Sequence, residues 1–250
     1  MLAAALLAVG AAAFVVGSAS RSNDAVEIAG ALADSYSVWE HTAGGTPVRW
    51  DPCSPLTIVV DSTDAPPAGR QDLDVAVEMV AEVTGLDIEV AGETEERPAG
   101  NRPAYQPERY GERWAPILVS WAPAGHNGVA LEDSDRAVAL PVAVGDEGEQ
   151  TYVTGQLVLN AAHDDLNSGF DDRATSWGAV LLHELGHLVG LGHTEDPGEL
   201  MHGSVVSGPV EFGPGDRAGL RAVGSEAGGC IDVPEPGPVN VARSTQVQRH

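Results

Sequence analysis

Basic residues are scarce in this sequence. It contains 13 Lys and Arg against 37 Asp and Glu in 250 residues, which gives a formal net charge of −24. Nucleic acids and anionic membrane surfaces repel such a chain, so nucleic-acid binding is excluded as the expected function. The negative electrostatic field of such a chain also favours neutral or basic substrates over acidic ones. Composition leaves the oligomeric state undetermined.

Cysteine is also scarce, with Cys53 and Cys230 as the only two. No Cys-x-x-Cys pair occurs, so the sequence supports neither a cysteine zinc site nor thioredoxin-type chemistry. Two cysteines in an exported chain are expected to pair. We therefore expect a disulfide between Cys53 and Cys230, with two unpaired buried thiols as the alternative.

Charged residues are absent from residues 1–20, where an apolar run ends in small residues. A membrane-spanning helix needs about 20 apolar residues, so the run is short for a span and fits a signal peptide. No Lys or Arg precedes it, which leaves an uncleaved anchor formed by residues 1–17 as the alternative. We expect a secreted or extracytoplasmic protein that contacts a membrane only through this segment, if it is not cleaved.

Apolar patterns along the rest of the chain predict alternating strands and helices. We expect strands at 56–61, 86–90, 116–121, 137–144 and 155–160. We expect helices at 71–84, 174–191 and 216–223, with Thr175 or Ser176 as the cap of the second. This order of elements is typical of an α+β domain with a twisted sheet.

The same patterns divide the chain into four parts. Residues 1–20 are the expected signal peptide or anchor, and residues 21–47 are a weakly patterned spacer. Residues 48–230 form the predicted catalytic domain. Residues 231–250 contain several prolines and are expected to form an irregular tail.

The most informative motif is His-Glu-x-x-His at positions 183–187. Residues four apart lie on one face of a helix, so His183 and His187 can direct two imidazoles to one point. Glu184 lies about 100° round the helix axis. It can therefore hold a water molecule beside a metal without being a ligand.

A third histidine, His193, follows in the same motif. It would point away if the helix continued, but Gly190 and Gly192 can adopt conformations that let the chain leave the helix and return. Three neutral imidazoles with an open fourth position are typical of a catalytic zinc site. A core helix that carries histidines by chance is the alternative, but packing does not explain three histidines and a glutamate.

Residues 179–201 resemble the zinc helix and the following turn of the metzincins, and within them the matrixins. The resemblance implies a metzincin-like catalytic domain whose twisted, mostly parallel sheet is accompanied by an active-site helix and a C-terminal helix. It implies Zn²⁺ held by His183, His187 and His193, and Glu184 as the catalytic residue. It also implies that Met201 is the Met-turn residue, whose thioether lies beneath the zinc ligands.

Three departures limit the resemblance. No Arg-Cys-Gly motif occurs, so the chain is similar to the bacterial type without a cysteine switch. His202 follows Met201, where matrixins more often place an aromatic residue and then proline. The calcium loops of the animal enzymes have no clear counterpart, although calcium is an open alternative at an acidic stretch that contains Asp164, Asp165, Asn167, Asp171 and Asp172.

These features together predict a zinc-dependent endopeptidase that acts on peptide or protein substrates. A metal-activated water would attack the peptide bond, with Glu184 as the general base. Substrate is expected to lie extended along a sheet edge, and 137–144 is the candidate strand. The alternatives are a dedicated hydrolase of a non-peptide amide and a zinc-bearing binding module, although a binding module has no use for Glu184. No Gly-x-Ser-x-Gly occurs to support serine chemistry.

Overall fold

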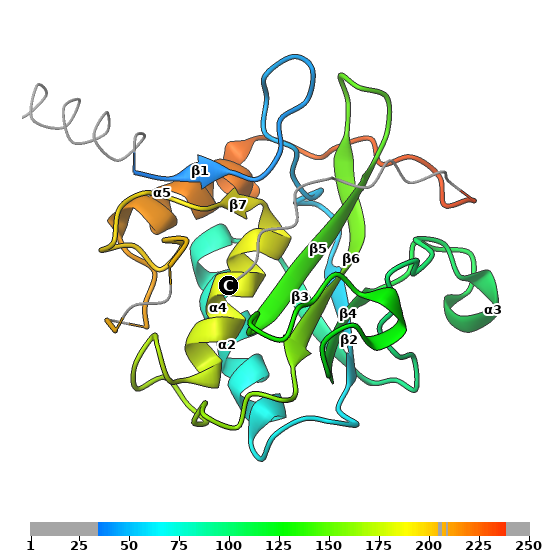
Figure 1. Ribbon diagram of the computed structural model, residues 1–250. Helices are drawn as coiled ribbons and strands as arrows, with labels where there is room; N and C mark the ends of the chain where they lie inside the picture. The colour runs from blue at the N-terminus through cyan, green and yellow to red at the C-terminus, as the bar shows by residue number, and fades with distance from the viewer. Residues whose placement is uncertain (1–34, 205–206, 209, 239–250) are drawn as a thin grey trace, which may run out of the picture.

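The computed structural model describes residues 35–204, 207–208 and 210–238 (Figure 1). The expected signal peptide or anchor, the first part of the expected spacer and the end of the expected tail lie outside these residues. Within the described part of the chain, no helix is long and apolar enough to cross a membrane.

A five-stranded sheet forms the centre of the fold, in the order β3-β2-β4-β6-β5 (Figure 1). Its strands are β2 (Leu56–Asp61), β3 (Ile88–Glu93), β4 (Ile117–Ala122), β5 (Ala137–Val144) and β6 (Thr151–Asn160). The first four in spatial order run parallel, whereas β5 is antiparallel to β6. The predicted mostly parallel sheet is confirmed, and β5 is an edge strand.

The strand predicted at 155–160 starts earlier, at Thr151, because its first half pairs with β5 as one arm of a hairpin. Gly155 interrupts the apolar pattern at the junction of the two halves. A Cβ at this position would lie only 3.0 Å from the Leu140 carbonyl oxygen and from Leu188 Cδ1. The glycine therefore allows the active-site helix to pack closely on the sheet.

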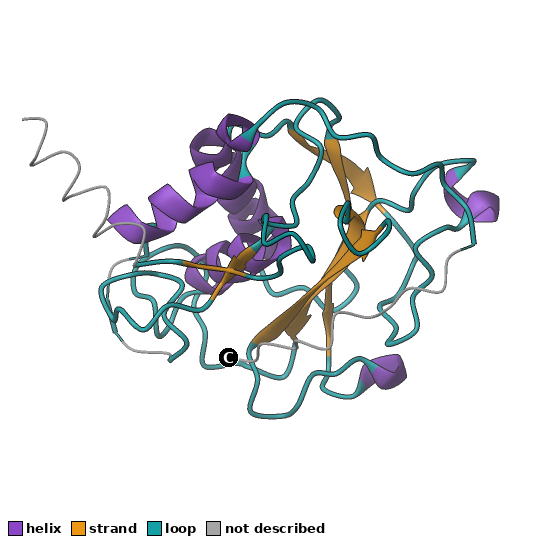
Figure 2. Ribbon diagram, turned by 90° about the horizontal axis from the view of Figure 1, so that it is seen from above, coloured by secondary structure: helices purple, strands orange, loops and turns teal. Residues whose placement is uncertain are grey.

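Three helices lie on one side of the sheet (Figure 2): α2 (Gly69–Thr84), α4 (Trp177–Val189) and α5 (Pro214–Val223). The short helix α3 (Pro107–Tyr110) and the 3₁₀ turns η1 (His126–Gly128) and η2 (Ser225–Ala227) lie in connections. Every residue of α4 is buried. Helix α4 is thus the centre of the core, and its histidines and glutamate lie inside the protein.

Residues 35–47 do not behave as the spacer that the sequence analysis expected. Strand β1 (Ser37–Val38) pairs antiparallel with β7 (Leu191–Gly192), directly after α4. Trp39 is only 3% exposed, and its amide donates to the Gly190 carbonyl at 2.8 Å. A two-residue strand has no periodicity that a sequence can display, which explains why the prediction was wrong here.

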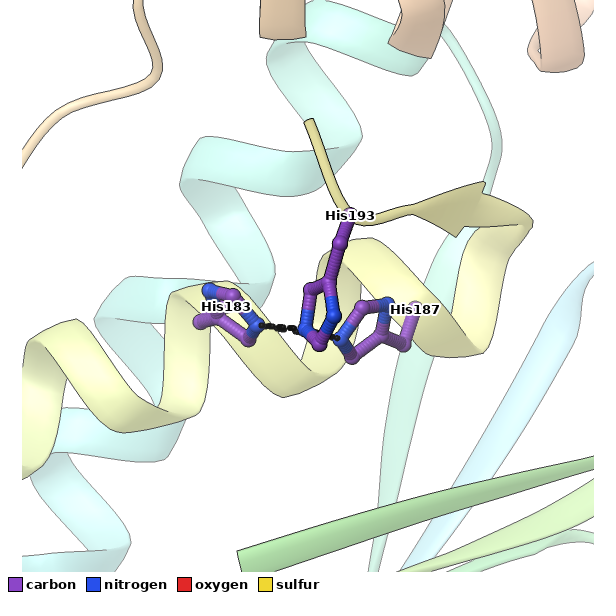
Figure 3. Close-up of side chains that lie close together, drawn as sticks. All are labelled: His183, His187 and His193. Atoms are coloured by element: carbon purple, nitrogen blue, oxygen red, sulfur yellow. Dashed lines mark hydrogen bonds between the residues drawn. The ribbon is translucent and has the colours of Figure 1, made fainter. Parts of the chain in front are cut away.

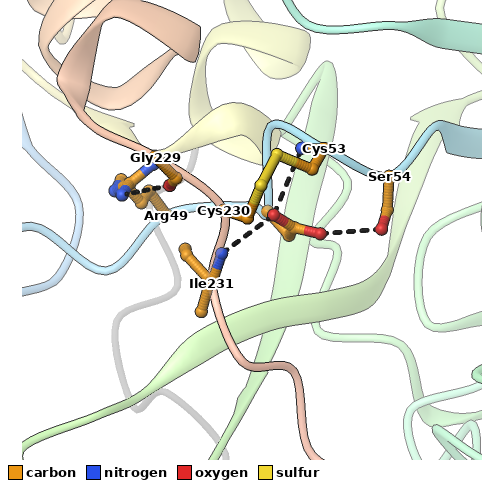
Figure 4. Close-up of a disulfide and its surroundings, with 7 residues drawn as sticks. Arg49, Cys53, Ser54, Gly229, Cys230 and Ile231 are labelled. Carbon is orange, nitrogen blue, oxygen red and sulfur yellow. Dashed lines mark hydrogen bonds between the residues drawn. A yellow bond between two sulfur atoms is a disulfide. The ribbon is translucent and has the colours of Figure 1, made fainter.

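The expected disulfide between Cys53 and Cys230 is present (Figure 4). Asp51 connects the same two segments, because its Oδ1 accepts from the amides of Cys53 at 3.2 Å and Ile231 at 3.0 Å. Arg49 donates from Nη2 to the Gly229 carbonyl at 3.1 Å. The segment after α5 is therefore fastened to the start of β2 by a covalent bond and several polar contacts.

Removing this disulfide should destabilise the fold without abolishing it. The bond joins residues 177 positions apart. Its loss in a Cys53→Ala, Cys230→Ala double variant should lower the free energy of unfolding by about 2–5 kcal/mol, because the unfolded chain gains conformational freedom. Urea titration of the variant and of the parent, each with and without reductant, measures this. Equal midpoints for parent and variant without reductant would contradict the prediction.

A chain that begins at Val48 tests whether residues 35–47 belong to the folded unit. It lacks β1 and the buried Trp39 side chain, and loss of a buried tryptophan typically costs about 3–5 kcal/mol. Its thermal unfolding midpoint should therefore lie well below that of a chain that begins at Asn23. Coincident melting curves would show that these residues contribute nothing to stability.

Candidate metal centre

Helix α4 supplies two of the three expected ligands. It begins after Ser176, the N-cap position, but the Ser176 hydroxyl does not cap the helix. Its Oγ instead accepts from the amides of Asp171 at 3.1 Å and Asp172 at 2.9 Å. The sequence therefore predicts the position of the cap correctly, whereas the hydroxyl organises the preceding loop.

The three expected ligands meet at one point (Figure 3). The Nε2 atoms of His183 and His187 are 3.0 Å apart, and His193 Nε2 lies 3.3 Å from the first and 3.1 Å from the second. A tetrahedral zinc site with Zn–N bonds of about 2.0–2.1 Å requires nitrogens about 3.3 Å apart. The triangle therefore fits one zinc-sized ion on its axis.

Backbone carbonyls determine the tautomers of two of these rings. His183 Nδ1 lies 2.8 Å from the Leu200 carbonyl oxygen, and His187 Nδ1 lies 2.8 Å from the Leu191 carbonyl oxygen. A carbonyl oxygen only accepts, so each Nδ1 carries the proton and each Nε2 presents its lone pair. Two neighbouring lone pairs without a proton between them repel, and a cation between them removes that repulsion.

The histidines are neutral at physiological pH. Burial, followed by the neighbouring His193, lowers the pKa of His183 to about 3. Burial, followed by His202, lowers the pKa of His193 to about 4. Burial also holds the pKa of His187 well below its usual value, with smaller contributions from the two other rings. Neutral imidazoles are the form that binds metals.

The return of His193 depends on Gly190, as expected. Gly190 ends α4 with φ of 119°, and its amide donates to the carbonyls of Gly186 and His187. The expected role of Gly192 is wrong, because its φ is not positive. A Cβ on Gly192 would instead lie 2.8 Å from Ser37 Oγ. This second glycine therefore allows β1 to approach β7 closely.

Met201 lies against α4 as the Met-turn interpretation expects. Its side chain is 1% exposed, and a Cβ on Gly186 would come within 2.5 Å of its Sδ atom. Its carbonyl accepts from the Thr194 amide at 3.0 Å, which ties the turn to the residue after His193. Any larger residue at position 186, directly before His187, would therefore collide with the Met201 thioether.

Two buried carboxylates hold this turn, and the sequence analysis gave neither of them a role. Asp216 accepts from the amides of Leu200 at 2.6 Å and Met201 at 3.3 Å. Glu199 accepts from the amides of Gly215 at 2.9 Å and Asp216 at 2.8 Å, in the first turn of α5. Burial and the nearby Glu199 raise the pKa of Asp216, although backbone amides oppose the rise.

Trp39 is a further residue whose role the sequence analysis missed. Its ring meets the His187 ring edge-on, with centroids 4.9 Å apart and planes at 63°. The contact orients one of the three imidazoles from the side of β1. A lone tryptophan in an otherwise polar segment was the available signal, because such a residue rarely stays in solvent.

Glu184 has a different environment from the other buried acids. It is fully buried, and neither carboxylate oxygen makes a well-formed hydrogen bond to any residue that the structure describes. Burial raises its pKa to about 8, while the backbone amide of Ala139 opposes the rise. A carboxyl group in this state is suited to exchange a proton near neutral pH.

The acidic stretch considered for calcium does not gather around a common point. Among the described residues, one other group has three potential ligand atoms together: Asp51, Cys53 and Cys230, whose sulfurs form the disulfide. Asp165 faces His163 at 3.1 Å, and Asp172 accepts from the Ala174 amide at 2.8 Å. These contacts are typical of a solvated loop.

Three imidazole nitrogens surround one point, and a buried glutamate that is not a ligand follows the first of these histidines in the sequence. This arrangement defines the site of a zinc metallopeptidase of the metzincin type. The comparison with protein families agrees: residues 108–223, just under half of the chain, match the family described as Matrixin (Peptidase_M10). The chain therefore contains a matrixin-like metzincin domain, and the resemblance is confirmed. The match ends with α5 and excludes β2, α2 and β3. No curated protein matches the chain.

In the metal-free protein, the raised pKa of the buried Glu184 carboxyl should make the free energy of unfolding depend on pH. Its pKa is about 8 in the folded chain against 4.5 normally, so the folded state keeps a proton that the unfolded state loses. Stability of the chelator-treated protein should fall as pH rises from about 4.5 to 8, by about 3–5 kcal/mol from this group. Glu184→Gln should lack this contribution.

Urea unfolding of both chelator-treated proteins across this pH range measures the difference. The free energy of unfolding of the variant should rise relative to that of the parent as pH increases to 8, and the difference should stay constant above pH 8. Added zinc should reduce this difference, because a cation favours the ionised carboxylate. A difference that is flat with pH would show that Glu184 is already ionised in the metal-free protein.

Proposed function

We propose that the protein is a zinc-dependent endopeptidase, with Zn²⁺ held by His183, His187 and His193 and with Glu184 as the catalytic residue. One observation carries the proposal: the Glu184 carboxyl is fully buried and lines the same cavity as His183, one of the three histidines whose Nε2 atoms converge, and the Ala139 amide is the one described group that acts on it as a donor. A buried carboxyl with so few hydrogen-bond donors costs stability, so its retention favours a chemical role.

The mechanism assigns each side chain one task. When bound, zinc supplies Lewis acidity toward the scissile carbonyl and the attacking water. Glu184 accepts a proton from that water as its oxygen attacks the carbonyl carbon, and the carboxyl then donates this proton to the leaving amine nitrogen as the C–N bond breaks. The neutral histidines would hold the metal, while His187 and His183 keep their Nδ1 protons and donate them to the backbone carbonyls of Leu191 and Leu200.

Substrate is proposed to bind along β5. This strand is an edge of the sheet and packs beside α4 (Figure 1). The backbone amide of Ala139, in the middle of β5, is close enough to Glu184 to influence its pKa. An extended peptide can add to such an edge as a further strand. Pro141 has no N–H, so at that position the strand can offer only its carbonyl.

Export from the cytoplasm belongs to the same proposal. The Cys53–Cys230 disulfide is typical of proteins that fold in an oxidising compartment. An endopeptidase acting outside the cytoplasm would also spare the proteins of its own cell. Residues 1–20 would provide the export signal, either cleaved or kept as an anchor.

The proposal predicts that Glu184→Ala separates catalysis from metal binding. The variant should retain one zinc per chain, because Glu184 is not a ligand, yet cleave a diverse peptide pool at least about 100-fold more slowly. Mass spectrometry of the pool gives the rates, and elemental analysis gives the zinc content. Glu82→Ala removes an exposed glutamate on α2 and serves as the control, with an unchanged rate.

The alternatives correspond to other results of the same experiment. Zinc in both proteins and cleavage by neither would favour a zinc-bearing binding module or a hydrolase of one dedicated, non-peptide substrate. Equal cleavage by parent and Glu184→Ala would overturn the role of Glu184. No zinc in the parent protein would overturn the metal site itself.

A further inference from the structure

The backbone groups along β5 alternate in direction, and one hydrogen bond fixes which of them face outward. The Asn160 amide of β6 donates to the Arg136 carbonyl at 2.8 Å, directly before β5 begins. In an antiparallel pair, the amide and the carbonyl of one residue point to the same side, and this side alternates along the strand. The backbone groups of Ala137, Ala139 and Pro141 therefore point away from β6, toward an edge that no described strand covers.

Two further observations agree with this direction. The Ala139 amide acts as a donor on the Glu184 carboxyl, which belongs to α4 and not to β6. Pro141 pairs with Gly155 of β6 in regular register, and a proline fits within a strand when its missing N–H faces outward. The hydrogen bonds between β5 and β6 are therefore intact at Pro141, and the missing donor affects only the outer edge.

Beside the metal centre, the outer edge of β5 can accept hydrogen bonds but hardly donate them. The carbonyls of Ala139 and Pro141 point outward, and no described group donates to either of them. The Ala139 amide is directed at Glu184, and Pro141 has no amide hydrogen. An added strand can thus donate to β5 at both positions, whereas its own carbonyls find no free donor there.

The regular edge also ends directly beyond Pro141. The register between β5 and β6 shifts between Val142 and Ala143, which marks a β-bulge. A bulge bends the strand, increases its twist and often terminates pairing. The missing donor and the bulge are thus adjacent, and both interrupt the outer edge at the same place.

We propose that Pro141 ends the part of β5 that binds substrate, so that the enzyme pairs with a short stretch of backbone and accepts chains that turn away at the residue opposite Pro141. The inference rests on the proposed peptidase function and specifies its substrate class, namely exposed loops of folded proteins rather than long extended chains. Pro141 is buried, so a substrate carbonyl held against it would lose water without gaining a donor. A loop that turns there keeps this carbonyl in water.

The first step of the experiment identifies the substrate residue that lies opposite Pro141. Amide nitrogens of a cleaved peptide are methylated one at a time, which removes one donor in each case. Methylation of the two residues that donate to the carbonyls of Ala139 and Pro141 should lower kcat/KM by at least about threefold. Ala139 is the nearer of the two to Glu184, so the affected residue farther from the scissile bond lies opposite Pro141.

The second step restores the missing donor. Peptides that stop one residue short of this position and peptides that extend several residues beyond it are compared by kcat/KM. Pro141→Ala and Pro141→Val both supply an outward N–H, and neither change removes a hydrogen bond to β6. Because one additional bond then forms with the extended peptide only, the ratio of extended to short should exceed that of the parent about three- to tenfold in both variants.

Pro55→Ala is the matched control, because it removes an exposed proline directly before β2, and β4 and β6 lie between β2 and β5. It should leave the ratio at the value of the parent. A higher ratio in Pro141→Ala alone would assign the effect to loss of the proline ring and overturn the role of the N–H. Unchanged ratios in both Pro141 variants would also overturn the proposal and limit Pro141 to protecting the edge from self-association.

A cyclic peptide tests the substrate class directly. Its chain turns just beyond the residue opposite Pro141, and a linear peptide of the same sequence is the comparison. The parent should cleave the cyclic peptide with at least the kcat/KM of the linear one, because a closed loop loses less conformational freedom on binding. A higher kcat/KM for the linear peptide would overturn the preference for loops.

Binding of the short and extended peptides to zinc-loaded Glu184→Ala, with and without Pro141→Ala, distinguishes failure of the inference from failure of the proposed function. Calorimetry gives the affinities. Cleavage by the parent with unchanged ratios in the Pro141 variants would overturn the inference and leave the peptidase intact. If the parent cleaves nothing but Pro141→Ala strengthens binding of the extended peptide alone, the edge is supported and the peptidase is overturned. Neither cleavage nor a change in binding would overturn both.

Discussion

The hydrogen bonds from two imidazoles to backbone carbonyls are the constraint on which the rest of this structure depends. His183 and His187 can present lone pairs to one point only if each Nδ1 proton is held elsewhere, by Leu200 and Leu191 respectively. Those carbonyls must in turn be held. Leu191 belongs to β7, which β1 fixes, and Leu200 is fixed through its amide by Asp216 on α5. Elements at both ends of the described chain therefore converge on two hydrogen bonds.

This dependence explains why the chain buries carboxylates despite its acidic composition. Glu199 and Asp216 accept from backbone amides in the Met-turn and the first turn of α5, so each contributes hydrogen bonds that offset part of the cost of its burial. Glu184 has no comparable partners among the described residues and lies beside the histidines. Burial is common to all three acids. The number of donors around each carboxylate separates the two that hold the backbone from the one suited to chemistry.

The sequence predicted features that depend on local patterns. Strand Leu56–Asp61 and strand Ala137–Val144 were predicted with their observed bounds, because apolar side chains mark them without help from distant residues. The spacing of the histidines predicted the metal centre, since helix geometry converts spacing into direction.

Features that depend on pairing across the fold could not be found in this way. β1 has two residues and exists only because β7 lies opposite, while the role of Trp39 depends on where His187 lies. Gly192 is a single residue whose role also could not be predicted from the sequence. The glycine was recognised as important, but its purpose is the close approach of Ser37, which no local pattern encodes. Arg136 and Arg173 likewise lie 37 residues apart in sequence and line one cavity only through the fold.

The charge distribution of the protein acts on two length scales that need not agree. An excess of acidic side chains determines the field at distances beyond about 8–10 Å, where only the sum of charges is felt and salt reduces it. At the distance of a direct contact, as between Arg102 and the buried Glu96 at 2.9 Å, individual charges outweigh that sum, because the interaction energy rises as the distance and the local dielectric constant fall. Net charge is therefore a guide to encounter rates. The ionisation and orientation of a buried side chain are decided by the few charges that touch it.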